Sequence, residues 1–426
     1  MAATQERSRS AARPAIWKLR DWRIGLKLLI AFLAAAIVPL ALSGFLSIRA
    51  SRDALLAEGI VNLSARNAST ADAISQFLTS HQEDASTFMT LSQLSAFATN
   101  PNDAATKASA LKILQSMTNR KYYQSVAIAN PAGIIILSSV AQDVNANIQS
   151  RNYFQQAMKD LNATSDVWVS PTTQQPSIYF SSPLLDSGGH VLGVLVSQVS
   201  FAGITDLVEK DADSVGPGTV GILLDENGIR IADSLSLRAR AAADKLLYTA
   251  VAPLPDATIQ QLVAEKRFGN ASAQTIAVTP LPEVASALGN PDAKSFESSA
   301  DNSTVRHYAT ISALTAKPWH YVLMTPLSTF TGAADNLAFT FILLTVVVAG
   351  ITAVVVIFIA HSFTAPIVHL TEVADRISMG ELDTQIGIDR GDEIGQLAEA
   401  IGRMQASLQA TIERLRARRA GGQDKT

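Results

Sequence analysis

Residues 125–139 read SVAIANPAGIIILSS, which is two apolar runs joined by Asn-Pro-Ala-Gly. Short apolar runs around such a joint predict an antiparallel β-hairpin with a tight turn. Residues 219–234, TVGILLDENGIRIADS, repeat the arrangement with Asp-Glu-Asn-Gly at the joint. Gly133 then aligns with Gly228, and Asn130 aligns with Asp225. A hairpin that recurs later in the chain predicts that one structural unit occurs twice.

The likeness between the two units continues downstream of each hairpin. Residues 179–201, YFSSPLLDSGGHVLGVLVSQVSF, parallel residues 307–330, HYATISALTAKPWHYVLMTPLSTF. In both stretches a strand, a turn and a second strand precede a serine-containing exit. We therefore predict two related antiparallel α+β modules in series. We interpret residues 235–303 as an alanine-rich, partly irregular insertion in the second module.

Two long apolar runs frame these modules. Leu28–Ile48 and Leu337–Ala360 contain no charged residue. With about 21 and about 24 residues at ~1.5 Å per residue, each can cross a hydrocarbon core ~30 Å thick. The first run is too long for a signal peptide and no small-residue cleavage site follows it, which favours a retained anchor. A transmembrane helix tolerates Pro39. We predict a protein that crosses a lipid bilayer twice.

The charges before the first run predict the orientation. That segment has only Glu6 and Asp21 as acidic residues, against a basic set of Arg7, Arg9, Arg13, Lys18, Arg20, Arg23 and Lys27. Such an excess places the N-terminus in the cytoplasm. Two spans then return the C-terminus to the cytoplasm and leave residues 49–336 outside.

The composition excludes several classes of function. The chain has no cysteine, so the exported part folds without disulfides, which its length permits. A net charge of −3 gives no basis for nucleic-acid binding. No nucleophile elbow or phosphate loop is found. The exported histidines lack metal-ligand spacing; they are His81, His190, His307 and His320. We expect no catalytic residues, no metal and no cofactor, because an enzyme would need an activity that no motif predicts.

The segment between the first span and the first hairpin is predicted to be one helix over residues 51–97. Its apolar residues fall on a seven-residue lattice: Leu56, Ile60, Leu63, Ile74, Phe77, Phe88 and Leu91. Polar residues occupy the lattice positions between them: Asn67, Thr70, His81 and Asp84. These interruptions argue against a uniform coiled coil. The stripe packs on its own domain or pairs with a second protomer, and the two roles are compatible.

This order of elements resembles the double Cache family of bacterial extracytoplasmic sensor domains over residues ~50 to 335. QSRNYFQQAM (149–158) is similar to the family's Arg-x-Tyr/Trp-Phe/Tyr element. GGHVLGVLVSQVSF (188–201) resembles its closing strand, and PWHYVLMTPLSTF (318–330) resembles its exit strand. The order of these motifs between two membrane spans is more specific than any one of them.

The resemblance implies a ligand pocket in the membrane-distal module. Its sheet contains Ile128, Ile135, Trp168, Tyr179 and Val196. Our candidate ligand contacts are Arg151, Tyr153, Trp168, Tyr179 and Gln198. Arg151 ranks first, because a guanidinium grips a carboxylate with two parallel hydrogen bonds. Tyr153 and Trp168 offer apolar walls with a polar group each. The alternative is a structural Arg151, tied to a backbone carbonyl or to Asp143, with aromatic residues that belong to the core.

The expected class of ligand follows from two departures from the family pattern. The family's amino-acid-binding subgroup adds a tyrosine five residues before the arginine and an aspartate on the closing strand. This sequence has Ala146 and Gln198 at those positions. A neutral Gln198 supplies no charge for an ammonium group. We therefore expect a small carboxylate, or another uncharged or acidic metabolite, in preference to a free amino acid or amine.

Residues 363–404, FTAPIVHLTEVADRISMGELDTQIGIDRGDEIGQLAEAIGRM, predict two short helices after the second span. The first has a heptad seam of Ile367, Leu370, Ala374 and Ile377. Gly380 ends it, and Asp392-Glu393 begin the second helix, where acidic residues suit the helix dipole. The second seam is Ile394, Leu397, Ile401, Met404 and Leu408. Neither helix buries its seam alone, so two protomers would form a parallel four-helix bundle.

This stretch resembles the HAMP linker, which relays motion from membrane helices to an output domain. The matching residues, and our candidates for signal relay, are Pro366, Gly380, Leu382, Asp392, Glu393, Gly395 and Leu397. The seam continues to Ile412 and Leu415 with a step of four where three was due, which indicates an adjustable joint or a fraying end. The basic residues 414–426 contact anionic lipid or an acidic partner, or form a solvated tail.

We predict the following layout: 1–27 basic cytoplasmic tail; 28–48 first span; 49–336 sensor, with a distal module about 98–205 and a proximal module about 215–330; 337–360 second span; 361–415 HAMP; 416–426 flexible tail. The predicted protein is a homodimeric sensory receptor of the bacterial inner membrane. No output domain is seen, so we expect a cytoplasmic signalling partner in trans. The alternatives are a remnant of a longer chemoreceptor or sensor kinase, and a solute-binding scaffold that does not signal.

Overall fold

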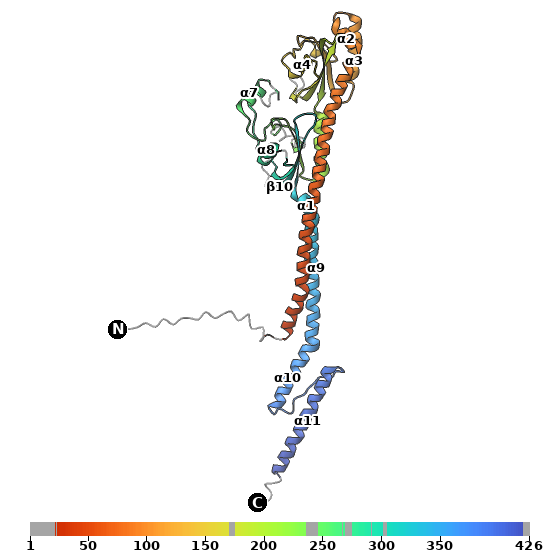
Figure 1. Ribbon diagram of the computed structural model, residues 1–426. Coiled ribbons are helices and arrows are strands. Elements are labelled where there is room, and N and C mark those ends of the chain that lie inside the picture. The colour runs from red at the N-terminus through yellow and green to blue at the C-terminus, as the bar shows by residue number, and fades with distance from the viewer. Residues whose placement is uncertain are drawn as a thin grey trace, which may run out of the picture. The chain divides into compact units, whose positions relative to one another are not determined.

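The computed structural model describes residues 22, 24–169, 175–235, 246–265, 267–268, 275–290, 292–300 and 305–420 (Figure 1). The chain divides into two units, Arg52–Gly332 and Met1–Ser51 with Ala333–Thr426. Most of the basic N-terminal tail and the last six residues lie outside the described residues, so the predictions made for them stay predictions.

The first helix, α1 (Ile24–Phe88), is continuous over 65 residues. We predicted that it would reach residue 97, and that boundary is wrong. The helix α2 (Ser92–Thr99) begins after a turn in which Leu91 is extended, with φ −71° and ψ 119°. Thr90 Oγ1 donates a 2.7 Å hydrogen bond to Thr87 O at this turn. Such short side chains compete with the helical ladder, which is consistent with an end at Phe88.

The first sheet contains six strands: β1 (Tyr123–Ala129), β2 (Ile135–Ser138), β3 (Ala163–Thr164), β4 (Trp168–Val169), β5 (Pro176–Leu185) and β6 (Val191–Ser200). It is antiparallel in the order β2-β1-β6-β5-β3, with β4 also paired to β5. One face packs with α1, α2 and α3 (Ala104–Thr118) in the main hydrophobic core. The other face packs with α4 (Asn152–Ala157) in a smaller cluster. We call β1–β6 with α2–α4 the first module.

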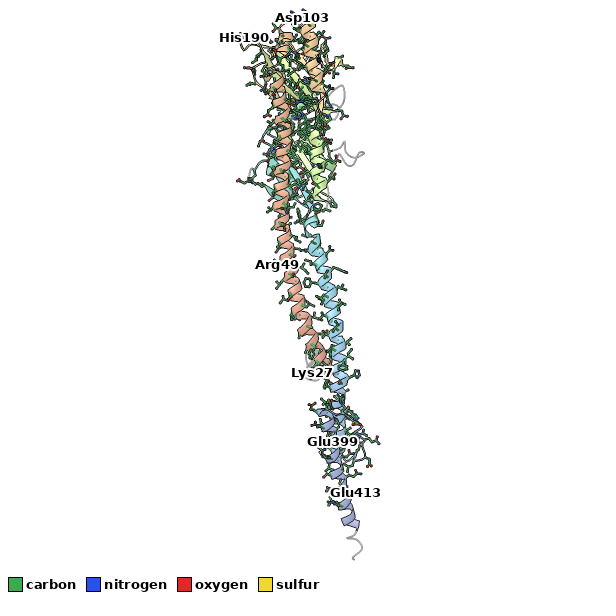
Figure 2. All side chains as sticks on the ribbon, turned by 90° about the vertical axis from the view of Figure 1, so that its right-hand side faces the viewer. Lys27, Arg49, Asp103, His190, Glu399 and Glu413 are labelled. Carbon is green, nitrogen blue, oxygen red and sulfur yellow. The ribbon has the colours of Figure 1, made fainter. Side chains whose placement is uncertain are left out.

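Figure 2 draws the side chains of the described residues as sticks on the ribbon. Asp103, which accepts a 2.8 Å hydrogen bond from Thr106 N and so caps α3, is labelled at the same end of the first module as His190 in the β5–β6 turn.

The second sheet contains β7 (Val220–Leu224), β8 (Arg230–Asp233), β9 (Ser295–Ser299), β10 (Arg306–Ala313) and β11 (His320–Pro326). Its order, β8-β7-β11-β10-β9, repeats the path β2-β1-β6-β5-β3 of the first sheet, and β4 has no counterpart among the described residues. The helices α5 (Ala202–Val215), α7 (Asp256–Ala264) and α8 (Pro282–Leu288) accompany it, and we call the whole the second module. The predicted doubled unit is confirmed. The described part of residues 235–303 is more ordered than predicted, since it supplies two helices and the strand β9.

The two aligned hairpin turns are stabilised by the same side-chain to backbone hydrogen bonds. Asn130 Oδ1 accepts hydrogen bonds from the backbone N–H groups two and four residues later, at 3.1 and 3.0 Å. Asp225 Oδ1 does the same at 2.9 and 2.9 Å. Gly133 and Gly228 adopt φ values of 78° and 73°, which glycine reaches without strain. The alignment of these four positions in the sequence therefore reflects identical turn geometry.

Two helices are long and apolar enough to be candidate membrane spans, Gly25–Phe88 and Leu327–Ser378. Their most apolar windows have mean hydropathies of 2.4 and 3.1, and only 6% of each window is buried within the protein. Apolar side chains that are exposed along such helices are suited to lipid as solvent. The second helix consists of α9 (Leu327–Ile359), a π-helical segment (Ala360–Thr364) and α10 (Ala365–Ser378).

The last helix, α11 (Glu393–Ala420), packs against α10. Leu370, Ile394 and Ala398 are buried at this contact, with Ile386, Ile388 and Ile401 packed around them. The predicted seam is only partly on this inner face, because Val373 is buried where Ala374 was expected. Leu397 and Leu408 remain 46% and 42% exposed. One chain therefore leaves much of the predicted seam uncovered, and α11 stays helical through the predicted stutter.

Candidate ligand-binding site

A cavity of about 240 Å³ lies in the first module, on the face of the sheet that carries α4. The strands, α4 and the loop before it supply its lining: Ser125, Ala127, Ile135, Asp143, Ala146, Asn147, Ile148, Arg151, Tyr153, Trp168, Val169, Tyr179, Val196 and Gln198. All five sequence-predicted ligand contacts are in this set, so the fold brings them together. A wider hollow of about 610 Å³ runs between the linker and α11, but it is an open groove on the protein surface.

Small side chains on β1 leave room for the cavity. Strand alternation points Ser125 and Ala127 toward it, while Ile128 is buried on the opposite face with the α1 core. The second module has larger apolar residues on the corresponding strands, and Ile222, Val322 and Met324 pack there with Leu281. Packing of that kind fills the space that the first module leaves open.

Arg151 lies directly before α4, and its side chain lines the cavity. Its backbone is extended, with φ −78° and ψ 131°, and the helix begins at the next residue. The guanidinium carbon lies 4.1 Å from the centroid of the Trp168 ring, a cation–π contact. Within the described residues no carboxylate is in ion-pair distance of Arg151, Asp143 included. Asp143 instead accepts a 3.2 Å hydrogen bond from Ser138 Oγ.

Two tyrosines form the wall beside Arg151. The rings of Tyr153 and Tyr179 stack at 5.1 Å with an angle of 5° between their planes. Burial raises the pKa of Tyr179 to about 12, against the opposing charge of Arg151. Burial raises the pKa of Tyr153 as well. Both hydroxyls therefore stay protonated at neutral pH and remain hydrogen-bond donors.

Gln198 forms a polar floor that the sheet holds in place. Its Nε2 donates to Gln124 Oε1 at 2.8 Å and to Ser177 Oγ at 3.1 Å. Its Oε1 accepts a 3.4 Å hydrogen bond from Ser125 Oγ. The side chain is 9% exposed. This network fixes the neutral amide of Gln198, so this position of the cavity carries no negative charge.

Ser125, Asn147 and Val169 line the cavity although they were not predicted to do so. Ser125 carried a usable signal, since a polar residue two positions before Ala127 in an apolar strand points to the same face. Asp143 was considered only as a partner of Arg151. Its place in the lining depends on the loop after β2, whose path no local pattern in the sequence specifies.

Most linker residues predicted for signal relay lie at the ends of the two helices, while Leu382 is in the connector and Leu397 is inside α11. Pro366 lies in the first turn of α10, and Gly380 follows that helix with φ 95°. Asp392 Oδ1 accepts a 3.1 Å hydrogen bond from Gly395 N and so caps α11, which begins at Glu393. Leu382 O accepts a 2.6 Å hydrogen bond from Gln405 Nε2, which ties the connector to α11.

Gly395 permits a close approach of the chain to itself. A Cβ atom there would lie 1.7 Å from Arg390 O, so no other residue fits this arrangement. Arg390 also forms an ion pair with Asp392, at 2.7 Å from Nη2 to Oδ2. Together these contacts fold the connector against the start of α11.

Comparisons with known proteins agree with this architecture. The model for the Cache domain matches residues 54–334, and the model for the HAMP domain matches residues 358–410. No curated protein sequence matches the chain. Among solved structures, the sensor domain of the Vibrio cholerae histidine kinase DctB is similar at 14% identity and a TM-score of 0.50, covering 64% of this chain and 98% of that one.

Two chemoreceptor domains are also similar. That of Campylobacter jejuni Tlp3 (CcmL) with isoleucine bound has 13% identity and a TM-score of 0.45, covering 66% of this chain and 97% of that one. That of Pseudomonas aeruginosa PctC in complex with GABA has 14% identity and a TM-score of 0.42, covering 62% and 98%. The first listed likeness supports the fold, and the Cache model spans well over half of the 426 residues. The chain therefore belongs to the Cache domain family, in the double form, and carries a HAMP domain after it.

Proposed function

We propose that this protein is a two-span membrane receptor that binds a small ligand in the first-module cavity and passes a conformational change through its HAMP domain. The observation that carries the proposal is the position of Arg151, whose charge faces the cavity without a carboxylate partner among the described residues. The two matched families are sensory and linker domains, which fits a receptor rather than an enzyme.

The proposed ligand is a small carboxylate. Arg151 offers a fork of N–H donors to it, and the protonated hydroxyls of Tyr153 and Tyr179 offer further donors beside that fork. Gln198 is neutral and already hydrogen-bonded, so it adds no negative charge. Among the described residues of the lining, Asp143 is the one acidic side chain. A ligand that carries an ammonium group would have to use Asp143.

The proposed topology is that of an inner-membrane protein with both termini in the cytoplasm and the Cache domain outside. It rests on the two candidate spans and on the basic residues before the first of them. The HAMP domain would then lie in the cytoplasm, where it can reach a signalling protein in trans.

The proposed assembly is a homodimer. Ile367, Leu397, Met404 and Leu408 are apolar and 42–46% exposed in one chain. A second copy of α10 and α11 would cover them in a parallel four-helix bundle. The ligand would shift the balance between two packings of that bundle to the extent that it prefers one of them.

Two alternatives make different predictions. A remnant of a longer receptor would bind ligand and change its HAMP packing without any partner in trans. A scaffold would keep the same HAMP packing with and without ligand. Because the chain contains no cysteine, single cysteines at Leu397 or Leu408 report on that packing without background cross-links.

The test is calorimetry on the full chain in lipid nanodiscs with acetate, lactate, succinate, GABA and isoleucine. We expect at least one carboxylate without an amino group to bind, and Arg151→Ala to abolish that binding. Arg306→Ala serves as the control, since it removes an exposed ion pair with Glu297 at 2.8 Å in the other module. A carboxylate that binds Arg151→Ala as tightly as the wild type would refute the assignment. Binding of GABA and isoleucine alone would assign the ammonium to Asp143.

A further inference from the structure

The strand that carries Trp168 is held on both edges. On one edge β4 pairs with β5, where Trp168 is opposite Ser177. On the other edge lies Arg267, which follows α7 in the second module. Its Nε donates a 3.2 Å hydrogen bond to Val167 O. Its carbonyl oxygen accepts a 3.0 Å hydrogen bond from Val169 N. One residue of the second module thus brackets the backbone of a residue that lines the cavity of the first.

The Arg267 guanidinium is buried among charges from both modules. The residue is 2% exposed, and its Nη2 lies 3.1 Å from Asp225 Oδ2, in the turn after β7. The same Nη2 lies 3.9 Å from Asp166 Oδ1, two residues before Trp168. Lys317, just before β11, is 2.8 Å from that Asp166 oxygen. Two cations and two anions therefore balance at the boundary between the modules, as a buried cluster requires.

The cluster is balanced in charge but not fully hydrogen-bonded. Arg267 Nη2 and Asp225 Oδ2 are buried, and their 3.1 Å contact does not have the geometry of a hydrogen bond. Their contacts are charge contacts, which lack the directional constraint of an aligned hydrogen bond. Small shifts of β4 therefore change the energy of these charge contacts gradually, while the two hydrogen bonds of Arg267 to Val167 O and Val169 N keep β4 attached to it.

We propose that Arg267 is a positioning residue for the ligand cavity, supplied by the second module, and that it couples the wall at Trp168 to the second sheet. The inference rests on the proposed function. Asp225 directly follows β7, and the last residue of β7, Leu224, pairs with His320 of β11. The strand β11 ends at Pro326 and α9 begins at the next residue. A displacement of Trp168 is thus transmitted to α9 through the Arg267 side chain and the pairing of β7 with β11.

The coupling works in both directions. If an occupied cavity prefers one position of β4, Arg267 transfers that preference to the second sheet, and the second sheet in turn alters the affinity of the cavity. Loss of the Arg267 side chain should therefore loosen β4 and the turn at Asp225 together. A purely structural role in the stability of the domain would loosen all strands alike.

The experiment is hydrogen exchange followed by mass spectrometry on the full chain in nanodiscs without ligand. In Arg267→Met we expect amide exchange about tenfold faster in peptides that contain Val169 and in the turn after Asp225, as for loss of a hydrogen bond to a charged group. Peptides from β5 and β6 should be unchanged. Arg306→Met, which removes the exposed ion pair with Glu297, is the matched control and should leave all of these peptides unchanged.

Arg267→Lys keeps the charge beside Asp225 but loses the Nε donor to Val167 O. In this variant we expect amide exchange in the turn after Asp225 to stay slow and exchange in β4 to be faster. The variant keeps the test decisive if Arg267→Met does not fold. Unchanged exchange at Val169 in a folded Arg267 variant would overturn the proposal, as would equal acceleration in every strand. The measurement needs no ligand, so it stands apart from the outcome of the carboxylate screen, which decides the proposed function.

Discussion

Arg390 donates a 2.7 Å hydrogen bond from Nη1 to the carbonyl oxygen of Ser362, within the π-helical segment that leads into α10. The same guanidinium pairs with Asp392, which caps α11. One side chain therefore joins the entry of the first linker helix to the start of the second. Single turns of π-helix occur often at functional sites. The contact ties the π-helical segment to the connector that precedes α11.

Loss of the Arg390 side chain should free this junction. In Arg390→Met we expect faster hydrogen exchange at residues 360–364 and at the start of α11, because both lose a charge-assisted hydrogen bond. Arg403→Met is the control, since Arg403 forms an exposed pair with Glu399 one turn away on α11, at 3.2 Å. Equal exchange in the two variants would show that Arg390 does not hold the junction.

Gly395 should be intolerant of any side chain. In Gly395→Ala the new Cβ would meet Arg390 O at 1.7 Å, so the connector must move away from α11. Such a backbone clash costs more than the ~1 kcal/mol that alanine gains over glycine in a helix. Gly391→Ala is the matched control, since no atom lies within 4 Å of its Cβ position. We expect the thermal unfolding of the HAMP domain to shift down only in Gly395→Ala, and equal shifts would contradict the account.

The Trp168 ring should contribute to ligand affinity through Arg151. Trp168→Leu removes the aromatic face 4.1 Å from the guanidinium, and the loss of a cation–π contact weakens binding by ~0.5–2 kcal/mol. Trp168→Phe keeps a weaker face and should fall between the two. Calorimetry with the carboxylate that binds the wild type best gives the three affinities. If all three were equal, Trp168 would be only a structural wall.

The free energy of unfolding of the Cache domain should depend on pH through the titration of Asp225. Burial raises the pKa of this carboxyl from 3.8 to about 6, while Arg267 opposes the rise and Asp166 adds to it. The folded state therefore holds the proton more tightly than the unfolded state. As pH rises from about 4 to about 6, the folded protein loses the stability that this proton supplied. Well above pH 6, Asp225 is ionised in both the folded and the unfolded state, and this proton contributes no further change in stability.

Asp225→Asn removes that titration and supplies the measurement. The melting temperature of Asp225→Asn minus that of the wild type should increase between pH 4.5 and pH 7, because only the wild type then carries a buried charge at Asp225. Asp186→Asn is a suitable comparison, since hydrogen bonds from His190 lower the pKa of that exposed carboxyl instead. A difference for Asp225→Asn that is independent of pH would place its pKa at the ordinary value.

The features that the sequence predicted well are those with local causes. The turns at Asn130 and Asp225 depend on hydrogen bonds that reach only four residues, and the glycine that follows each is visible in the sequence. The start of α11 at Asp392 has the same character. The apolar spans depend on composition alone.

The features that were missed depend on contacts between distant residues. The end of α1 at Phe88 is accompanied by a side-chain hydrogen bond at Thr90 that a heptad pattern does not reveal. The strand β9 is polar and gains its place from pairing with β10. Arg267 lies 100 residues from Val167, to which its side chain donates, and no short motif marks that pair.

The most direct test of the central claim is disulfide cross-linking of a single cysteine at Leu408 in the full chain in native membranes. The cysteine-free background makes every cross-link specific to that site. With the carboxylate found by calorimetry, we predict a change in the rate of cross-linking in the wild-type cavity and none in the Arg151→Ala background. Identical rates with and without a ligand that binds would contradict signalling through HAMP and would leave a solute-binding scaffold.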